Sequence, residues 1–475
     1  MRRTRYRAQW VLPVSAPPIR EGALLVDDDG RIAAVGPDQA VPRPEDAQQV
    51  DLGNAALLPG LVNVHAHPEL SALRNLLEDL SFFDWINTLR RVKARAPLDD
   101  AALLTSALWQ LAEAYAAGIT TIAATEDSAA TFDALLETGG RGVVYREVFG
   151  PDPAQCAAAM RGLRERVESM RARETGLVRV GISPHAPYTV SDDLFQATAR
   201  LAASEALPVA VHIAESHAET DLVARGEGVF AQALRRRGID TPARARSPVE
   251  LLARTGILER QPLLIHAVRI DASDIRLIAD AGAAIAHCPT ANARLGHGVA
   301  PVLQLLEAGA TVGLGTDSVA SNNRLDLLEE GRTAQLMQRA AACSHDALDA
   351  AALLRMATLD GARALGIEDE CGSLEPGKSA DLAAVSLARV HAQPAHDINA
   401  ALVLAARGSD IVLTVVRGRV LYRSCSGDAH AAGDENGPTG TLSSAKPGHT
   451  TIDVDAVRDR MERIAERVAA ARAGS

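Results

Sequence analysis

Two histidines one residue apart close an apolar run of the sequence. His65 and His67 stand at its end, in Leu57-Leu58-Pro59-Gly60-Leu61-Val62-Asn63-Val64-His65-Ala66-His67. Residues i and i+2 of a β-strand point to the same side, so the two imidazoles converge. Neutral imidazoles at the end of a buried strand supply half of a site for zinc or a similar divalent ion. Taken alone, the pair is equally compatible with two hydrogen-bonded core histidines.

Three later segments repeat the pattern of an apolar strand that ends in a side chain able to bind a metal. They end at His212, at His266 and at Asp317, and Glu215 follows His212 by three residues. Each strand precedes a segment with helical spacing of apolar residues. A (β/α)₈ barrel collects such groups at the mouth formed by the carboxyl ends of its strands. The whole set therefore favours a metal site over a chance pairing.

Eight strands that alternate with helices are predicted to position these groups, which is the number that a closed barrel needs. They are Leu57 to His65, Thr120 to Thr125, Gly142 to Phe149, Val178 to Ser183, Val209 to Ile213, Leu263 to His266, Ala283 to His287 and Thr311 to Thr316. Helical spacing occurs between them, for example in 101–117, 191–205 and 273–281.

Short β segments flank the predicted barrel on both sides. Before it come Gln9 to Leu12, Gly22 to Val26 and Arg31 to Val35, with a hairpin turn at 27–30. After it come Leu382 to Val385 and Val412 to Val416, which can rejoin the first sheet. Residues 424–450, rich in Gly, Ser, Ala, Pro and Asp, predict a flexible linker. Val454 to Ala471 predicts an exposed charged helix, a solvated tail or weak oligomer contact.

Composition narrows the class of protein. Among 475 residues the net charge is −11 and no Lys/Arg-rich block occurs, which argues against nucleic-acid and anionic-membrane partners. No apolar run reaches the roughly 18 residues of a membrane span. Five widely spaced cysteines without a CxxC pair suggest neither disulfides nor a cysteine zinc site. We expect a soluble cytoplasmic protein that acts on small molecules.

Several motifs, in order, resemble the amidohydrolase superfamily over roughly residues 5–422. The resemblance is to its cytosine-deaminase-like branch, which includes adenosine, S-adenosylhomocysteine and aminofutalosine deaminases and triazine chlorohydrolases. The motifs are Pro59-Gly60-x-x-Asn63-x-His65-x-His67, Pro184-His185-Ala186-Pro187-Tyr188, His212-x-x-Glu215, His287-Cys288-Pro289, Gly315-Thr316-Asp317-Ser318 with Ser321-Asn322-Asn323, and the closing segment 372–382.

This resemblance implies an α/β fold in which a (β/α)₈ TIM barrel is joined to a small β-sandwich formed by both chain ends. The expected division is 1–58 for the first part of the sandwich, 59–370 for the barrel, 371–423 for the second part of the sandwich, and 424–475 for the linker and terminal helix. The family also suggests a homodimer.

The resemblance further implies one divalent ion held by His65, His67, His212 and Asp317. Imidazole and carboxylate ligands suit zinc best, with iron(II) as the alternative. Dinuclear relatives bring a carboxylated lysine from the fourth strand, whereas 178–183 contains no Lys, so a single ion is expected. A bound ion makes water nucleophilic near pH 7.

The resemblance also implies catalytic roles for Glu215, Asp317 and His266. Glu215 would shuttle protons, protonating the ring nitrogen beside the attacked carbon and then the departing amine. Asp317, besides ligation, can accept a proton from the attacking water. His266 would orient that water and stabilise developing charge, with a role as fifth ligand as the alternative.

Four residues are predicted to contact the substrate: His185, Trp85, Arg146 and Glu147. His185 resembles the histidine that related deaminases use on the sugar, and Arg146, or Arg90 and Arg91, would suit a carboxylate. Trp85, in the aromatic segment 80–86, either caps the pocket or merely packs a loop helix. Among other histidines, His287 is expected to make a supporting hydrogen bond and His217 to be solvated, while the sequence leaves His297 undecided.

The segments around His67, Trp85, Arg146 and Glu215 are similar to those of aminofutalosine deaminases. They suggest hydrolysis of 6-amino-6-deoxyfutalosine to futalosine and ammonia, in menaquinone biosynthesis. The basic stretch 90–95 stands where adenosine-type relatives carry a ribose-binding glutamate, which counts against S-adenosylhomocysteine and methylthioadenosine. The alternatives are a deaminase of those nucleosides, of guanine or of a pterin, a triazine-type chlorohydrolase, and an inactive binding paralogue.

Overall fold

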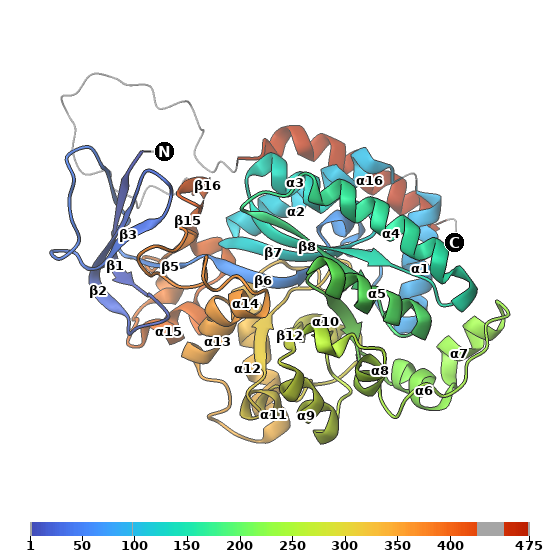
Figure 1. Ribbon diagram of the computed structural model, residues 1–475. Coiled ribbons are helices and arrows are strands. Elements are labelled where there is room, and N and C mark those ends of the chain that lie inside the picture. The colour runs from blue at the N-terminus through green and yellow to red at the C-terminus, as the bar shows by residue number, and fades with distance from the viewer. Residues whose placement is uncertain (1, 97, 425–450, 474–475) are drawn as a thin grey trace.

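The computed structural model describes residues 2–96, 98–424 and 451–473 (Figure 1). Eight parallel strands form the barrel: β6 (Leu61–Ala66), β7 (Ile119–Glu126), β8 (Arg141–Val148), β9 (Val178–Pro184), β10 (Ala210–Ile213), β11 (Leu263–His266), β12 (Ala284–His287) and β13 (Thr311–Leu314). The predicted barrel is confirmed.

Helices connect the strands and cover the outside of the barrel (Figure 1). They are α1 (Phe82–Arg95), α2 (Asp100–Ala116), α3 (Ala130–Thr138), α4 (Cys156–Arg171), α5 (Asp192–Glu205), α6 (His217–Arg225), α7 (Gly228–Arg235), α8 (Pro248–Arg254), α9 (Ala272–Ala281), α10 (Pro289–Arg294), α11 (Val302–Glu307), α12 (Leu327–Ala342), α13 (Ala350–Met356) and α14 (Leu359–Ala364). In the described parts of the chain, none of the helices is both long and apolar enough to cross a membrane.

The barrel consists of two four-stranded sheets, β6–β9 and β10–β13. Two isolated backbone bridges join them. Ala66 pairs with Asp317 where β6 meets the end of β13, and Ile182 pairs with Val209 where β9 meets β10. We call these contacts the first seam and the second seam. The predicted metal ligands lie at these seams. Asp317 forms the first bridge with Ala66, whose neighbours are His65 and His67, and His212 lies just after the second bridge.

Alternation along the strands separates the interior of the barrel from its helical shell. On β8, Val143 and Tyr145 pack with other inward residues such as Val64, whereas Val144 and Val148 pack in the core beneath the helices. Successive strand residues point to opposite faces, so Glu147 continues the inward series and Arg146 the outward one.

The first predicted barrel strand, Leu57 to His65, is wrong as a single strand. The structure divides it into β5 (Ala55–Pro59), which belongs to the small domain, and β6. Gly60 lies at the break, and a Cβ there would come within 2.1 Å of the Thr120 side chain. The chain passes from one domain to the other at a position where only glycine leaves enough room.

Both ends of the chain build one β domain, as the fold prediction expected. Its strands are β1 (Thr4–Val11), β2 (Ile19–Val26), β3 (Ile32–Pro37), β4 (Gln48–Asp51), β5, β14 (Leu382–Ser386), β15 (Ile411–Val416) and β16 (Arg419–Arg423). The sheet runs in the order β16-β15-β14-β5-β1-β2-β3, and β4 pairs with β1. A bridge between Arg31 and Ser379 brings the start of β3 beside the segment before β14, so the sheet encloses its own core. The short helix α15 (Ile398–Ala400) lies between β14 and β15. The boundaries at 58 and 371 remain our proposal.

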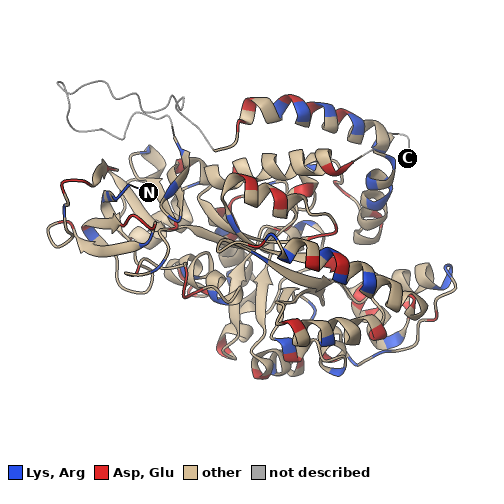
Figure 2. Cartoon of the chain, turned by 45° about the horizontal axis from the view of Figure 1, so that its top comes forward, with Lys and Arg blue, Asp and Glu red and all other residues tan. Residues whose placement is uncertain are grey.

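The C-terminal helix α16 (Val454–Ala473) differs from the exposed tail predicted for it. Charged residues occur all along this helix (Figure 2) and most of them are exposed, but a stripe of apolar side chains is buried: Val457, Met461, Ile464 and Val468. Spacings of three and four residues place them on one face. This face packs on α2 and α1 and joins the main hydrophobic core. The predicted linker falls, except for Ser424, outside the described residues.

Candidate active site

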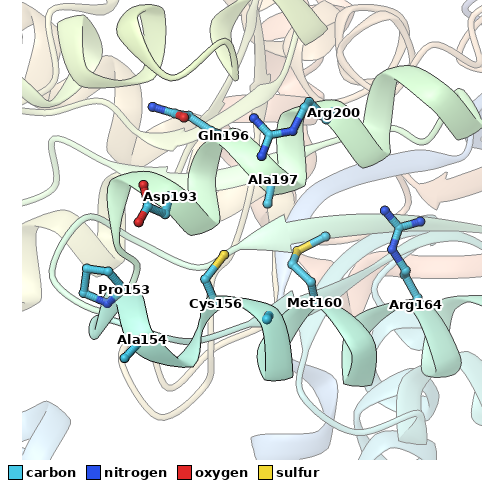
Figure 3. Close-up of a pocket in the computed structure, with 10 residues that line it drawn as sticks. Pro153, Ala154, Cys156, Met160, Arg164, Asp193, Gln196, Ala197 and Arg200 are labelled. Atoms are coloured by element: carbon cyan, nitrogen blue, oxygen red, sulfur yellow. The ribbon is translucent and has the colours of Figure 1, made fainter.

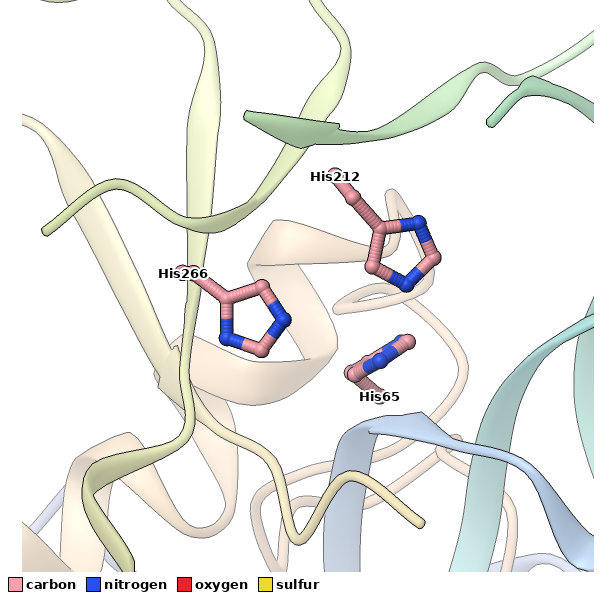
Figure 4. A group of neighbouring side chains, drawn as sticks. All are labelled: His65, His212 and His266. Carbon is pink, nitrogen blue, oxygen red and sulfur yellow. The ribbon is translucent and has the colours of Figure 1, made fainter. Parts of the chain in front are cut away.

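Three histidines from three different strands converge at the carboxyl ends of the barrel strands (Figure 4). The ring centroids of His65 and His212 are 5.0 Å apart, and those of His65 and His266 are 5.9 Å apart. Their nearest nitrogen atoms all lie within 4.8 Å of one another. His67 follows directly after β6, with its ring centroid 4.8 Å from that of His65.

Asp317 completes this group from the other side of the first seam. Its Oδ1 atom lies 3.4 Å from Nε2 of His65 and 3.6 Å from Nε2 of His67. The backbone is held in a left-handed conformation, with φ of 58°, and its N–H donates to the carbonyl of His65 at 2.9 Å. Ser321 donates to Oδ2 and the Ser318 N–H to Oδ1. A strained backbone fixed by several bonds is typical of a functional site.

The protonation states suit metal binding. Burial lowers the pKa values of His65 and His212, and lowers the pKa of His67 to about 3, so these rings carry lone pairs at neutral pH. Burial alone would raise the pKa of Asp317, but the neighbouring imidazoles of His65, His266 and His67 hold it below its usual range. Its carboxyl is therefore ionised.

An orphaned nitrogen tests whether these residues fit a divalent ion. Nε2 of His65 is buried and, among the described residues, has no hydrogen-bond partner. Nδ1 of His212 donates to the carbonyl of His185 at 3.2 Å, which leaves its Nε2 lone pair for the site. Three neutral imidazoles and one carboxylate are a donor set typical of zinc. The residues present therefore fit such an ion.

Glu215 lies just beyond β10, beside this group. Its Oε1 atom is 3.5 Å from Nε2 of His266 and 3.1 Å from Nε2 of His297. Burial alone would raise the pKa of Glu215, but these two imidazoles lower it. The loop takes a left-handed turn at Ala214, and both carboxylate oxygens of Glu219 accept backbone N–H groups, from Ala214 and from Glu215. Glu219 thus holds the segment that carries Glu215.

His266 is oriented from behind by an asparagine. Its Nδ1 donates to Oδ1 of Asn292 at 2.9 Å, and its backbone has a φ of 77°. The hydrogen bond fixes the ring so that Nε2 faces Glu215 and the histidine cluster. Nε2 of His266 therefore faces the centre, and the role predicted for this residue stays a prediction.

His185 directly follows β9 at the second seam, and Glu147 lies beside it on the neighbouring strand β8. Nδ1 of His185 donates to the Thr189 hydroxyl at 2.8 Å, and Nε2 is 3.9 Å from Oε1 of Glu147. Oε1 of Glu147 is buried and lacks a hydrogen-bond partner in the described chain. Burial and the charge of Asp127 raise the pKa of Glu147 to about 8. Both side chains lie beside His212, within 4.8 Å of it by their nearest ligand atoms.

Trp85 is held more tightly than a free capping residue would be. The side chain is buried, and its indole N–H donates to the carbonyl of Ala320 at 3.3 Å. Another aromatic residue of α1 makes the ring contacts. The ring of Phe82 meets those of His297 and Tyr188 edge-on, with centroids 4.6 Å and 6.2 Å apart. The second of the two predicted alternatives, a packed helix, describes Trp85 better.

Arg146 does not point into the site. It belongs to the outward series on β8, is buried, and donates a hydrogen bond from Nη1 to the carbonyl of Ser128. Burial lowers its pKa, while Glu126 and Asp127 raise it. The predicted contact with a substrate carboxylate is therefore not supported by this placement. Arg90 and Arg91 are exposed on α1, and Arg91 bonds to Thr88.

A sequence comparison decides the family. The model of the amidohydrolase family matches residues 56–421. The chain belongs to the amidohydrolase family.

Sequence relatives and solved structures agree with this assignment. A 5-methylthioadenosine/S-adenosylhomocysteine deaminase of Moorella thermoacetica is 33% identical over 86% of this chain and 92% of its own length. A 5′-deoxyadenosine deaminase of Methanothermobacter thermautotrophicus is 33% identical over 86% of this chain and 91% of its own. The structure of a zinc-bound adenosine deaminase from Xanthomonas campestris matches 98% of both chains, with a TM-score of 0.83 and 27% identity.

An atrazine chlorohydrolase from Arthrobacter aurescens TC1, complexed with zinc, is similar as well. It matches with a TM-score of 0.79 and 25% identity over 97% of this chain and 100% of its own. The amidohydrolase described here is therefore an enzyme of the deaminase branch, one that hydrolyses C–N bonds. The predicted family, fold class and enzyme class are confirmed.

Sequence reasoning missed several residues around the centre of this amidohydrolase. Asn292 and Glu219 are supporting residues that the prediction did not include, whereas His297, which the sequence left undecided, lies against Glu215. A signal existed for Glu219, because Ser216-x-x-Glu219 has the spacing of a capping box at a helix start. The expected hydrogen bond of His287 is wrong, since both of its ring nitrogens lack partners among the described residues. His217 is exposed, as predicted.

A separate hollow lies on the outside of the amidohydrolase barrel, between α4 and α5 (Figure 3). Cys156, Met160 and Arg164 line it from α4, and Asp193, Gln196 and Arg200 from α5. None of the predicted site residues reaches it. The chemistry described above is therefore confined to the mouth of the barrel.

Proposed function

We propose that this amidohydrolase deaminates 6-aminopurine nucleosides that carry a modified 5′ position. The observation that carries the proposal is the convergence of His65, His67, His212 and Asp317 beside the buried carboxyl of Glu215. Relatives named as methylthioadenosine, S-adenosylhomocysteine and 5′-deoxyadenosine deaminases support the substrate class.

In this mechanism the four ligand residues would hold one divalent ion, zinc in the first place and iron(II) as the alternative. When bound, an ion of this kind lowers the pKa of water towards neutrality and supplies the nucleophile. Glu215 takes one proton from the water as it attacks and gives it to the ring nitrogen beside C6, which makes that carbon electrophilic. A C6–O bond forms, and the second water proton, accepted by Asp317, passes through Glu215 to the amine. The C6–N bond then breaks and the amine leaves as ammonia.

Two other residues assist this sequence. Asp317 is ionised and accepts a proton as the nucleophile is generated. His266, fixed by Asn292, holds the attacking oxygen in place and stabilises charge as the tetrahedral carbon forms. His185 and Glu147 would bind the sugar, because an imidazole nitrogen and a protonated carboxyl can both exchange hydrogen bonds with hydroxyl groups.

Aminofutalosine is a second candidate substrate, and one observation favours it. Phe149 is 41% exposed beside His185, with their ring centroids 4.9 Å apart. An exposed aromatic ring at the mouth can stack on an aryl substituent such as the benzoate of aminofutalosine. Lys93 on α1 adds a positive charge near Glu147, although it also pairs with Asp127 at 3.1 Å.

A substrate panel tests the proposal. Zinc-loaded and iron-loaded enzyme would be assayed for ammonia release and for the ultraviolet change from aminopurine to hydroxypurine. The panel contains 5′-methylthioadenosine, S-adenosylhomocysteine, 5′-deoxyadenosine, adenosine, aminofutalosine, guanine, a pterin and a chlorotriazine. Fast turnover of 5′-modified adenosines is expected. Turnover of aminofutalosine alone would support the second candidate, and turnover of only the triazine, the pterin or guanine would refute both. The homodimer and the cytoplasmic location stay predictions.

A further inference from the structure

His297 occupies a position that neither the sequence pattern nor the proposed mechanism explains. It lies in the loop between α10 and α11, and its imidazole is buried. Nε2 is 3.1 Å from Oε1 of Glu215 and, among the described residues, has no aligned hydrogen-bond partner. Gly296 and Gly298 flank it, with φ values of 71° and 101°, so the loop uses two left-handed turns to present this side chain.

One residue places both imidazoles that face Glu215. The side chain of Asn292 accepts the hydrogen bond from Nδ1 of His266 at 2.9 Å, and its backbone carbonyl accepts the N–H of His297 at 2.8 Å. The ring of Phe82 meets His297 edge-on from the other side, at 4.6 Å between centroids. The imidazole is thus held through its backbone and by a ring contact, as a residue with a geometric role requires.

The two imidazoles cannot serve Glu215 in the same way. The Nδ1 proton of His266 is used on Asn292, so a neutral His266 presents only a lone pair at Nε2 and cannot donate to a carboxylate. His297 is then the ring that can supply a proton to Oε1. Both nitrogens face Oε1, and no described residue donates a hydrogen bond to Oε2. Oε2 is left for proton exchange.

We propose that His297 is a positioning residue, which donates from Nε2 to Oε1 of Glu215 and so holds the carboxyl with Oε2 towards the substrate ring. This inference rests on the proposed function, in which Glu215 moves the protons. It also links the proton shuttle to α1, because Phe82 at the start of that helix supports the imidazole. A substrate that displaces Phe82 would therefore disturb Glu215 through His297.

Two substitutions separate donation from packing. His297→Phe keeps a ring against Phe82 but removes the donor, whereas His297→Gln keeps an N–H donor on a flexible chain. On the best substrate of the panel, we expect Phe to lower kcat by about 10- to 100-fold with KM within about threefold, and Gln to stay within about threefold of the parent enzyme. Zinc content should not change. His217→Phe, at an exposed histidine, is the matched control.

Three results would overturn this role. If the Phe variant were as active as the parent enzyme, His297 would only pack against its neighbours. If its KM rose at constant kcat, His297 would bind the substrate. If both variants lost activity, the loss could not be assigned to the hydrogen-bond donor. Crystal structures of zinc-loaded parent and His297→Phe enzymes give a readout that needs no substrate. We expect the Glu215 carboxyl to rotate in the variant, and an unmoved carboxyl would refute the proposal even if the substrate class proves wrong.

Discussion

The two seams of the barrel are built alike but serve different ends. At the first, two backbone N–H groups, of Thr316 and Asp317, donate to the carbonyl of His65, and Asn63 bonds to both the side chain and the N–H of Thr316. At the second, the N–H and the ring of His212 both bond to the carbonyl of His185. In each case a carbonyl beside the bridge fixes a residue of the site.

Exposure distinguishes the two. The side chain of His65 is 1% exposed, whereas that of His185 is 19% exposed and has the open ring of Phe149 beside it. A closed seam suits groups that must keep one geometry for the reaction, and an open seam suits groups that must meet different substrates. Under the proposed function, the first seam serves the reaction, whereas the second seam serves both the reaction, through His212, and specificity, through His185.

The largest effect is expected at the first seam. Asp317→Asn keeps the shape of the side chain but removes the negative charge that a divalent ion needs, so zinc content should fall well below one ion per chain and turnover below detection. Metal analysis and the ammonia assay measure both. Asp280→Asn, at an exposed position on α9, is the control. Full zinc content in the Asp317 variant would contradict the role of this seam.

A large but different effect is expected for Glu215, which follows the strand that closes the second seam. Glu215→Gln removes the acid without removing a ligand, so turnover should fall by at least ~10² while folding and zinc content are kept. Circular dichroism, metal analysis and kcat would be compared with those of Glu259→Gln, an exposed control. Near-normal turnover would remove Glu215 from the proton shuttle.

A smaller effect, on binding, is expected at the open seam. His185→Ala should raise KM for a nucleoside about tenfold, because a buried hydrogen bond to a substrate hydroxyl is worth about 1–2 kcal/mol. Its kcat and zinc content should change little, and His217→Ala is the control. If zinc were lost instead, the division between the seams would fail, since His185 would then support the ion through His212.

The smallest effect is expected at Thr189, whose hydroxyl holds the ring of His185 by one hydrogen bond. Thr189→Val removes the hydroxyl that accepts from Nδ1 of His185, so the ring should lose its fixed orientation. We expect KM to rise about threefold, in proportion to roughly 0.7 kcal/mol, with kcat unchanged. Steady-state kinetics on the same nucleoside measure it. A larger change than that of His185→Ala would show that Thr189 acts through the backbone of Ala186, to which its hydroxyl donates.

Much of this site could be predicted from the sequence, because barrel topology does the long-range work. Residues at the carboxyl ends of parallel strands meet wherever the strands close, so His65, His212, His266 and Asp317 needed only the strand pattern. The predicted substrate contact of Arg146 is not supported because successive residues of a strand point to opposite faces, so Glu147 points inward and Arg146 outward. Sequence alone does not say which of two polar neighbours, Arg146 or Glu147, points inward.

The supporting residues could not be found in the same way. Glu219 acts from the first turn of α6, Asn292 from α10 and His297 from the loop after α10. Their contacts depend on left-handed turns at positions such as Ala214 and Gly298. Such turns are set by distant contacts and leave little trace in hydrophobic periodicity. The C-terminal helix is a different case. Its apolar residues have helical spacing in the sequence, but the many charged residues between them led to the prediction of an exposed helix.

The buried apolar stripe of α16 makes the end of the chain important for the stability of the fold. Full burial of one valine, isoleucine or methionine side chain contributes about 1.5–3 kcal/mol, and α16 buries Val457, Met461, Ile464 and Val468. The sum is comparable to the whole net stability of an ordinary domain, about 5–15 kcal/mol. A chain shortened at residue 424 would expose the apolar surfaces of α1 and α2, so aggregation during expression, more than loss of an optional tail, is the expected outcome of trimming.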